Sequence, residues 1–420
     1  MNSSEESSPV SSPGISRQST PATEANKLSD DEIFQTVTEE HVLVTGGLGF
    51  IGSHTTLELL KAGYNVIIVD DLSNSFRDVF SQILTIANRH FDSCGGRCPK
   101  AEFHNLNYRD GLAMRALLES HRPARFSGEQ RRSNIIGVIH FASFKAVEES
   151  IRQPLKYYQN NINGLVDFMT ILQGYDIRTF IFSSSATVYG TLADGRRLLR
   201  EEHCVHEDET YQDTDGTEKR AQPGFIGITS PYGRTKFFGE AILSDLAKSD
   251  PSWNIVALRY FNPIGCDASG LLGEDPKRVP SNLLPVVVKV LTGQYQELSV
   301  YGRDWNTPDG SAVRDFIHVT DLARGHLAAL SAAQAGRIRG SYRTFNIGTG
   351  TGNSVLEVVA AMESASERPI STKTVGRRAG DVQSSVAAAD RARLELGWEA
   401  KESLTDACRD VWNYLKLRGV

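Results

Sequence analysis

The chain has 420 residues, of which 40% are hydrophobic and 23% are charged, and its formal net charge is −6. This size and composition suit an enzyme-sized globular protein with a large core. The net negative charge gives no broad basic surface for a polyphosphate backbone, so we expect no nucleic-acid partner. No apolar run is long enough to cross a bilayer and no secretory signal opens the chain, so we expect a soluble, cytoplasmic protein without a membrane partner.

Residues 1–38 are rich in Ser, Thr, Pro and Glu, with few large apolar residues. Such a segment cannot bury enough surface to offset its ordering entropy, so we expect a disordered tail. Five cysteines are scattered along the chain, and only Cys94 and Cys98 lie close together. Without a second pair to complete a zinc site, free thiols are favoured, and we expect no metal site.

From His41 onward the pattern changes to an apolar strand, a glycine-rich turn, an amphipathic helix and a second strand. Further apolar strands are expected near 135–143, 179–185 and 254–262, separated by helical stretches. This alternation predicts an α/β protein with a doubly wound parallel sheet covered by helices on both faces. After residue 262 the alternation loosens, which indicates a smaller second lobe over the carboxyl edge of the sheet.

Three segments interrupt this pattern and are interpreted as insertions: residues 94–100, 124–134 and 193–228. The third is rich in Asp, Glu, Arg and Thr and has little periodicity. We therefore expect it to be a loop rather than part of the core.

The glycine-rich turn, Thr45 to Gly52, follows a strand and opens a helix. In this context Gly46, Gly49 and Gly52 allow a pyrophosphate to approach the N–H groups of the helix. Asp70 ends the next strand, 18 residues after Gly52. A carboxylate there accepts hydrogen bonds from a ribose diol and repels a 2′-phosphate, so the motif favours NAD over NADP.

Tyr232 and Lys236 lie one turn apart in SPYGRTK, which has the pattern of a helix start. A phenol has an ordinary pKa near 10, and a nearby ammonium and a nicotinamide cation would favour its anion. Ser185 ends the serine run after the strand at 179–185, where it could share the proton of a substrate. These three residues are the predicted catalytic group.

The chain resembles the extended short-chain dehydrogenase/reductase family, and within it the UDP-hexose 4-epimerases. The resemblance rests on VLVTGGLGFIGSHT, VIHFASFKAVEES, FIFSSSATVYG, SPYGRTKFFGE, RYFNPIG, GEDP, VRDFIHVTDLARGH, FNIGTGTGNSVLEV and RRAGD, which run in order from Val42 to about Leu415. It implies a Rossmann-type NAD-binding domain over 39–262 and a UDP-sugar-binding lobe over 263–420, parts of which return to the first domain. It also implies a homodimer.

By this resemblance, Tyr232 removes the proton of the sugar 4-hydroxyl while hydride passes to tightly held NAD. The 4-keto sugar then turns over and takes hydride back on its other face, which interconverts UDP-glucose and UDP-galactose. Such a site must hold the nucleotide firmly and the hexose loosely.

The implied NAD contacts include two departures from the family pattern: Asn107 stands where an acidic residue is usual, and Ser143 where a glycine is usual. Besides the glycine turn and the catalytic group, these contacts are Phe50, Ile51, Asp70, Asp71, Leu72, Ser73, Asn74, Ser75, Asn107, Tyr108, Phe141, Ala142, Ser143, Phe144, Lys145, Asn161 and Phe261. The implied substrate contacts, besides Ser185 and Tyr232, are Lys145, Asn262, Asn282, Leu283, Ser299, Val300, Tyr301, Arg314, Arg378, Asp381 and Ser385. Because Ser385 is small at a position beside the sugar 2-substituent, we expect the N-acetylated UDP-hexoses to be accepted as well.

Three other readings stay open to different degrees. A dehydratase of the same fold is poorly supported, because Ala186-Thr187 stands where those enzymes carry Asp-Glu. A UDP-xylose or UDP-glucuronate 4-epimerase is harder to distinguish from an enzyme that acts on UDP-glucose, since these enzymes differ in a few groups around carbon 6 of the sugar. A non-catalytic NAD-binding regulator would have no need for Ser185, Tyr232 and Lys236 together.

Overall fold

The computed structural model describes residues 39–420 apart from 123–132, 196–197, 214, 226, 278, 281 and 379. The predicted disordered tail and most of the predicted insertion at 124–134 lie outside the described residues. Among the described residues, no helix is both long enough and apolar enough to cross a membrane.

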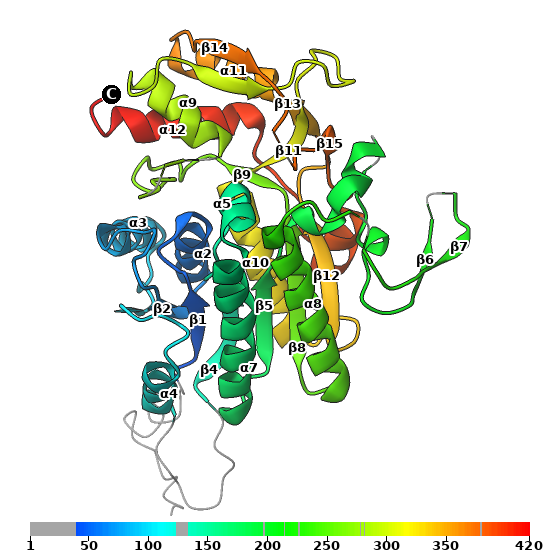
Figure 1. Ribbon diagram of the computed structural model, residues 1–420. Helices are drawn as coiled ribbons and strands as arrows, with labels where there is room; N and C mark the ends of the chain where they lie inside the picture. The colour runs from blue at the N-terminus through cyan, green and yellow to red at the C-terminus, as the bar shows by residue number, and fades with distance from the viewer. Residues whose placement is uncertain are drawn as a thin grey trace, which may run out of the picture. The chain divides into compact units, whose positions relative to one another are not determined.

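Seven strands form one parallel sheet in the order β12-β8-β5-β4-β1-β2-β3, which confirms the predicted doubly wound, Rossmann-type architecture (Figure 1). The chain builds one half of the sheet outward from β1 and then returns to build the other half from β4, so the strand order changes direction between these two strands. The strands are β1 (His41–Thr45), β2 (Asn65–Val69), β3 (Ala101–His104), β4 (Ile135–His140), β5 (Thr179–Ser183), β8 (Asn254–Tyr260) and β12 (Tyr342–Ile347).

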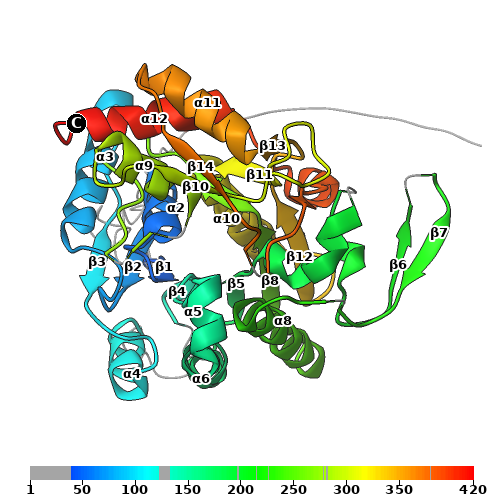
Figure 2. The same ribbon diagram turned by 45° about the horizontal axis from the view of Figure 1, so that its top comes forward.

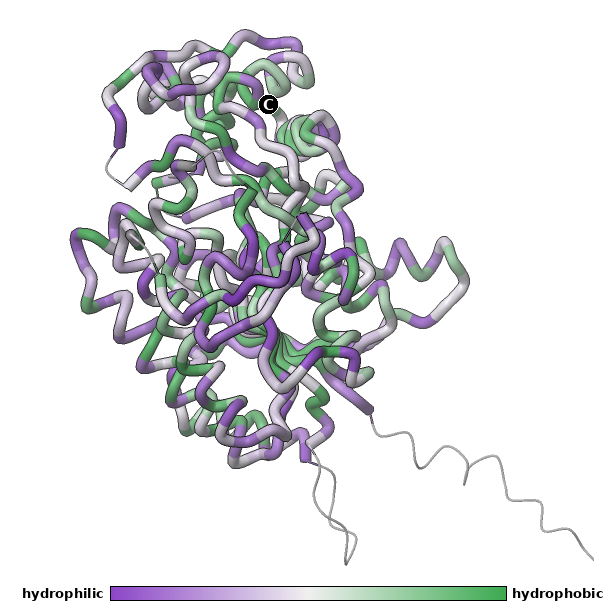
Figure 3. Tube along the Cα trace, turned by 90° about the vertical axis from the view of Figure 1, so that its right-hand side faces the viewer, coloured by the Kyte–Doolittle hydropathy of each residue, from purple (hydrophilic) through white to green (hydrophobic). Residues whose placement is uncertain are grey.

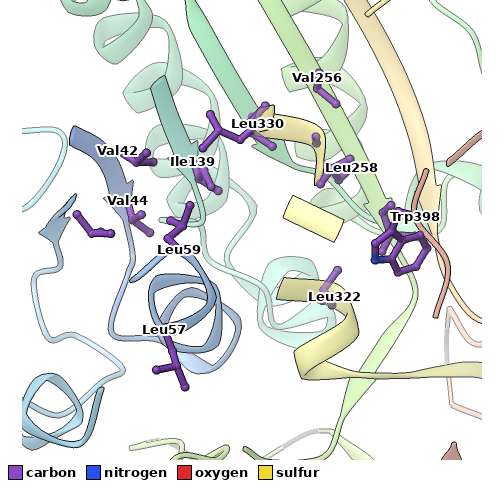
Figure 4. Close-up of a cluster of buried hydrophobic side chains, with 14 of the residues drawn as sticks. Val42, Val44, Leu57, Leu59, Ile139, Val256, Leu258, Leu322, Leu330 and Trp398 are labelled. Carbon is purple, nitrogen blue, oxygen red and sulfur yellow. The ribbon is translucent and has the colours of Figure 1, made fainter. Parts of the chain in front are cut away.

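Helices cover both faces of the sheet, which explains why its strands read as nearly continuous apolar runs. On one face, α2 (Phe50–Lys61), α3 (Asp78–Cys94) and α10 (Val319–Gln334) pack on the strands in a shared core, part of which Figure 4 shows. On the other face lie α4 (Gly111–Ser120), α7 (Gly164–Gly174) and α8 (Pro231–Ser249). Hydrophobic and hydrophilic residues alternate along the outer helices, as expected when only one side of a helix faces the sheet (Figure 3).

A second group of elements packs around its own core, apart from the central sheet. It contains α9 (Leu283–Leu291), α11 (Val355–Ser366), α12 (Leu404–Lys416) and the parallel pair β10 (Leu298–Tyr301) and β14 (Thr372–Val375). β11 (Val313–His318) joins β9 (Asn262–Ile264), β13 (Gly352–Ser354) and β15 (Ser384–Ser385). In Figure 1 this group lies above the central sheet, whereas α10 and β12, which precede and follow parts of it in the chain, belong to the sheet layers.

The remaining short elements connect these layers. They are α5 (Val147–Arg152), α6 (Pro154–Tyr158), a π-helical turn at Gln159–Asn163, 3₁₀ turns within Ala186–Gly195 and at Glu201–His203, and a π-helical turn at Ala392–Leu396.

The segment 193–228 is not simply a surface loop, and that prediction was wrong in part. Its second half forms an antiparallel hairpin of β6 (Glu209–Gln212) and β7 (Glu218–Ala221), which projects from the body in both views (Figures 1 and 2). Its first half is core, because Leu199, Glu201 and Cys204 are buried. The polar sequence did not indicate that this first half is buried, because the hydrogen-bond partners that compensate its burial come from β8 and β12.

Those partners are Arg259 and Asn346. The guanidinium of Arg259 donates to the carbonyl oxygens of Glu201 at 3.2 Å and Cys204 at 2.7 Å. The backbone N–H of Asn346 donates to Glu201 Oε1 at 2.7 Å. Buried polar groups are tolerated when they are paired in this way, so the insertion is fastened to two strands of the central sheet.

Candidate active site

A cleft opens at the carboxyl ends of the sheet strands, between β1 and β4, where the strand order changes direction. Open α/β sheets bind ligands at this place. The glycine turn, the loops after β2 and β4 and the start of α8 form one wall, and residues around α9 and the end of α12 form the other. Predicted site residues in the lining are Gly46, Gly49, Phe50, Ile51, Gly52, Asp70, Asp71, Ser73, Asn74, Ser75, Asn107, Tyr108, Phe141, Ala142, Ser143, Phe144, Lys145, Tyr232, Lys236 and Asn282.

The glycine turn leaves room for a ligand against the start of α2. Gly46 has a φ of +72°, and a Cβ built on Gly52 would lie 2.1 Å from the carbonyl oxygen of Gly46. Gly49 caps the helix without a side-chain hydrogen bond, and the first turn holds no acidic residue. The first N–H groups of α2 and its positive dipole end are therefore available to a pyrophosphate.

Asp70 fixes the end of β2 beside this turn. Its buried carboxylate accepts hydrogen bonds from Leu48 N at 3.0 Å, Leu72 N at 2.9 Å and Ser75 Oγ at 2.7 Å. These bonds orient the carboxylate, and its remaining lone pairs can accept the hydroxyls of a ribose. Its charge disfavours a 2′-phosphate, so the residues present fit NAD.

Tyr232 and Lys236 lie in the first turns of α8, as predicted. Ser230 caps the helix by accepting from Gly233 N at 3.1 Å, and Pro231 occupies the first helical position. Ser150 Oγ, from α5, accepts the backbone N–H of Tyr232 at 3.1 Å. The helix start, and with it the phenol, is therefore held from two sides.

Lys236 is buried and reaches across to the ends of two strands. Its ammonium donates to the carbonyl oxygen of Ser183 at 2.6 Å and to Ser143 Oγ at 3.1 Å. Burial lowers the pKa of Lys236 to about 7, and the charge of Glu240 opposes that shift.

The phenol of Tyr232 is not made acidic by the protein alone. Burial raises its pKa above the ordinary value, the neighbouring phenol of Tyr260 raises it further, and a hydrogen bond from Ser185 lowers it. The ammonium of Lys236 lies 5.9 Å from the centre of the Tyr232 ring. Forming the phenolate therefore requires positive charge from a bound ligand in addition to the lysine.

The serine run at the end of β5, Ser183 to Ser185, divides its hydroxyls among three partners. Ser183 donates to the phenol oxygen of Tyr260 at 2.9 Å, and Ser184 donates to Glu240. Ser185 forms a hydrogen bond with the side chain of Tyr232. Within this run, only the last serine therefore contacts Tyr232.

Glu240 is fully buried and accepts the hydrogen bond from Ser184 in this serine run. Burial opposes its ionisation, but the charge of Arg259 and hydrogen bonds from His206 and Arg259 lower its pKa to about 2. It is a charged residue that the sequence analysis missed, although its position four residues after Lys236 on the same helix face was a usable signal.

Four of the predicted substrate residues, which we call the arginine cluster, lie together outside the cleft lining: Arg314, Arg378, Asp381 and Tyr301. Arg378 Nη2 is 2.9 Å from Asp381 Oδ1, Arg314 Nη2 is 3.9 Å from the same oxygen, and the Arg378 guanidinium lies 5.1 Å from the Tyr301 ring centre. Ser385 pairs with Arg314 in register between β15 and β11.

The other predicted substrate residues are spread out. Lys145 and Asn282 meet at the cleft wall, where Glu274 Oε1 lies 3.3 Å from Lys145 Nζ and 2.9 Å from Asn282 Nδ2. The side chain of Val300 is part of the core of the second group, so only its backbone can face a ligand. Asn262 begins β9, Leu283 begins α9 and Ser299 lies in β10, all outside the cleft lining.

Four predicted cofactor residues do not line the cleft: Leu72, Asn161, Ser185 and Phe261. Asn161 instead holds the loop after β4, because its amide exchanges two 3.0 Å hydrogen bonds with the backbone of Phe144. It also donates to Thr235 Oγ1 at 3.0 Å, next to Lys236. Lining residues that the sequence analysis did not single out include Leu48, Ser53, Phe76, Gln82, Glu149, Tyr157, Tyr260, Glu274 and Arg418.

A family model described as the NAD dependent epimerase/dehydratase family matches residues 42–348. A UDP-glucose 4-epimerase of Dictyostelium discoideum is 42% identical over 379 residues, which are 90% of this chain and 96% of that protein. A human UDP-glucose 4-epimerase is 41% identical over 377 residues, with coverage of 90% and 97%.

Solved structures agree with these matches. A UDP-glucose 4-epimerase from Bifidobacterium longum, in complex with NAD⁺ and UDP, has a TM-score of 0.75 at 39% identity and covers 90% of this chain and 98% of that one. A UDP-Glc/GlcNAc 4-epimerase from Campylobacter jejuni has a TM-score of 0.65 at 28% identity, with coverage of 90% and 99%.

Proposed function

Since the chain belongs to the NAD dependent epimerase/dehydratase family, we propose that it is a UDP-glucose 4-epimerase, which interconverts UDP-galactose and UDP-glucose through a 4-keto intermediate with NAD as its tightly held cofactor. The observation that carries this proposal is the position of Tyr232 and Lys236 in the same cleft as the glycine turn and Asp70. Relatives 41–42% identical over 90% of the chain bear the same name.

NAD bound in this cleft supplies a hydride acceptor and a positive charge. The first turn of α2 and Gly52 hold its pyrophosphate, and Asp70 holds a ribose. Tyr232 accepts the proton of the sugar 4-hydroxyl and later returns it, while Ser185 donates a hydrogen bond that stabilises the phenolate. Lys236 adds positive charge at the same place and holds the strand ends through Ser183.

The substrate is divided between firm and loose contacts. Arg314 and Arg378 offer planar donors to the diphosphate, while the hexose has few partners and can turn over. In this arrangement residues 39–262 mainly carry the cofactor and 263–420 mainly carry the nucleotide sugar. The small side chain of Ser385, beside Arg314, leaves room for an N-acetyl group on the sugar.

The test is a product assay with purified protein and four substrates: UDP-galactose, UDP-N-acetylgalactosamine, UDP-xylose and UDP-glucuronate. Conversion of UDP-galactose to UDP-glucose without added NAD, together with release of NAD on denaturation, supports the proposal. Conversion of UDP-xylose or UDP-glucuronate alone would overturn the substrate assignment, and no conversion of any of them would overturn the activity. If UDP-galactose is converted but UDP-N-acetylgalactosamine is not, the proposal that Ser385 leaves room for an N-acetyl group is wrong, and the rest of the proposal stands.

The protein is further proposed to act as a homodimer in the cytoplasm, on its resemblance to the extended short-chain dehydrogenase/reductase family. Light scattering on the purified protein and fractionation of its source cells test these two statements separately.

A further inference from the structure

A group of imidazole and carboxylate side chains lies at the amino-terminal edge of the sheet, at the opposite ends of the strands from the cleft. His41 opens β1, Glu102 lies in β3, and His121 follows the last turn of α4. One ligand atom from each lies within 4.8 Å of the other two. We call these three residues the histidine-glutamate group. In Figure 1, α4 lies at the end of the molecule away from α9 and α12, so this group is remote from the candidate active site.

The hydrogen bonds of both histidines fix which ring nitrogen carries the proton. His41 Nδ1 is 2.7 Å from the carbonyl oxygen of Glu39, and His121 Nδ1 is 3.0 Å from that of Leu117. A carbonyl oxygen only accepts, so each Nδ1 donates and each neutral ring has its lone pair on Nε2. A backbone carbonyl on the far ring nitrogen is the usual second contact of a metal-ligating histidine.

His41 Nε2 is buried and has no hydrogen-bond partner among the described residues, although His41 is only 4% exposed. A buried acceptor without a partner costs free energy. His121 Nε2 lies 3.3 Å from Glu102 Oε2, so the imidazole and the carboxylate that complete the group face each other beside it.

The geometry fits a small tetrahedral ion. With metal–ligand distances of about 2.0–2.1 Å, neighbouring ligand atoms are roughly 3.3 Å apart, which is the distance from His121 Nε2 to Glu102 Oε2. The three ligand atoms lie within 4.8 Å of one another, so the wider separations must close to about 3.3 Å. Glu102 and His121 are both partly exposed and can rotate by this amount. His104 Nε2, 3.4 Å from Glu102 Oε2, is placed to orient the carboxylate.

We propose that His41, Glu102 and His121 bind one divalent transition-metal ion, zinc by ligand preference, with water in the fourth position. The ion joins the end of α4 to the amino ends of β1 and β3. Because it binds the folded chain, it raises stability with metal concentration. It plays no part in the epimerase reaction, and the proposal goes beyond that function.

The sequence did not reveal this site, because its ligands come from three segments with no local spacing pattern. Cys94 and Cys98, which did attract notice as possible ligands, must be removed from the test, since Cys94 is exposed and Cys98 is partly exposed. The experiment therefore uses the untagged full-length protein carrying Cys94→Ser and Cys98→Ser, stripped with a chelator and dialysed.

Zinc is titrated by calorimetry and by its effect on the thermal midpoint, and cobalt(II) serves as a spectroscopic probe. We expect one zinc per chain, a rise in the midpoint, and visible cobalt bands of a tetrahedral site. Glu102→Gln and His121→Gln should each weaken zinc binding at least about tenfold, while His90→Gln, on α3, should not change it, and all three should retain epimerase activity. Stoichiometric zinc binding that survives both substitutions, or no binding at micromolar free zinc, would overturn the proposal.

Discussion

Oε2 of Glu240 lies 2.6 Å from Nη2 of Arg259, and neither side chain has any exposed surface. The pair connects α8, which carries Tyr232 and Lys236, to β8, and Ser184 ties the same carboxylate to the end of β5. The site therefore rests on a buried charge pair that also holds the first half of the 193–228 insertion.

Replacing Glu240 with Gln keeps the shape of the side chain but leaves Arg259 buried without a counter-charge. Breaking a buried pair in this way costs about 3–5 kcal/mol, and we expect that loss in urea unfolding of the variant. The matched control is Glu207→Gln, whose exposed pair with Lys248 should contribute little. Equal unfolding midpoints for the two variants would contradict this account of the pair.

The lowered pKa of Lys236 predicts a pH-dependent stability of the NAD-free protein. The pKa is about 7 in the folded chain and near 10.5 when unfolded. Between these values the unfolded chain binds more protons, so this lysine makes stability rise with pH, by up to about 1.4 kcal/mol per pH unit. The free-energy cost of burying the charged ammonium of Lys236 is fully present below about pH 7.

Lys236→Met removes that titration. We expect the variant to be more stable than the parent near pH 7, and the difference to shrink toward pH 10. Denaturant unfolding at several pH values measures it. A difference that stays constant over this range would mean that the lysine has an ordinary pKa.

Gly52→Ala should distort the proposed cofactor subsite, because the new Cβ would meet the carbonyl oxygen of Gly46 at 2.1 Å. We expect NAD binding at least about tenfold weaker, which corresponds to about 1.4 kcal/mol. Gly174→Ala is the control, since nothing lies within 4 Å of a Cβ there. NAD titration of both proteins makes the comparison, and equal affinities would remove Gly52 from the proposed site.

Arg378→Ala should raise the KM for UDP-galactose with a smaller effect on kcat, because its proposed contact is with the diphosphate. A hydrogen bond to a charged group contributes about 1.5–3 kcal/mol, or roughly 10- to 150-fold in KM. The neighbouring Arg377 pairs instead with Asp304 and stacks on Trp305. Arg377→Ala is therefore the control, and an equal rise in KM would show that the effect is not specific to the arginine cluster.

The spacing of residues along short segments predicted those parts of the candidate site that lie within one turn or at the start of one helix. The glycine turn, Asp70 and the Tyr232–Lys236 pair each depend on spacing along one segment, and the structure brings them to one cleft. Asn161 could not be assigned in this way, since its amide is used within the protein to hold Phe144.

Contacts between distant segments were beyond the sequence pattern. The burial of Glu201 depends on Arg259 and Asn346, which come from strands 58 and 145 residues away. The polar composition of the insertion indicated a loop because the compensating partners could not be known. The same limit hid the approach of His41 to Glu102 and His121.

The central claim is that the phenol of Tyr232 takes the sugar proton. Its most direct test is the kcat of Tyr232→Phe with UDP-galactose, measured on protein shown to retain NAD, beside Tyr260→Phe, another tyrosine of the same cleft. We predict that kcat falls by about 10²-fold or more for Tyr232→Phe and far less for Tyr260→Phe. An NAD-loaded Tyr232→Phe protein with the parent kcat would contradict the account.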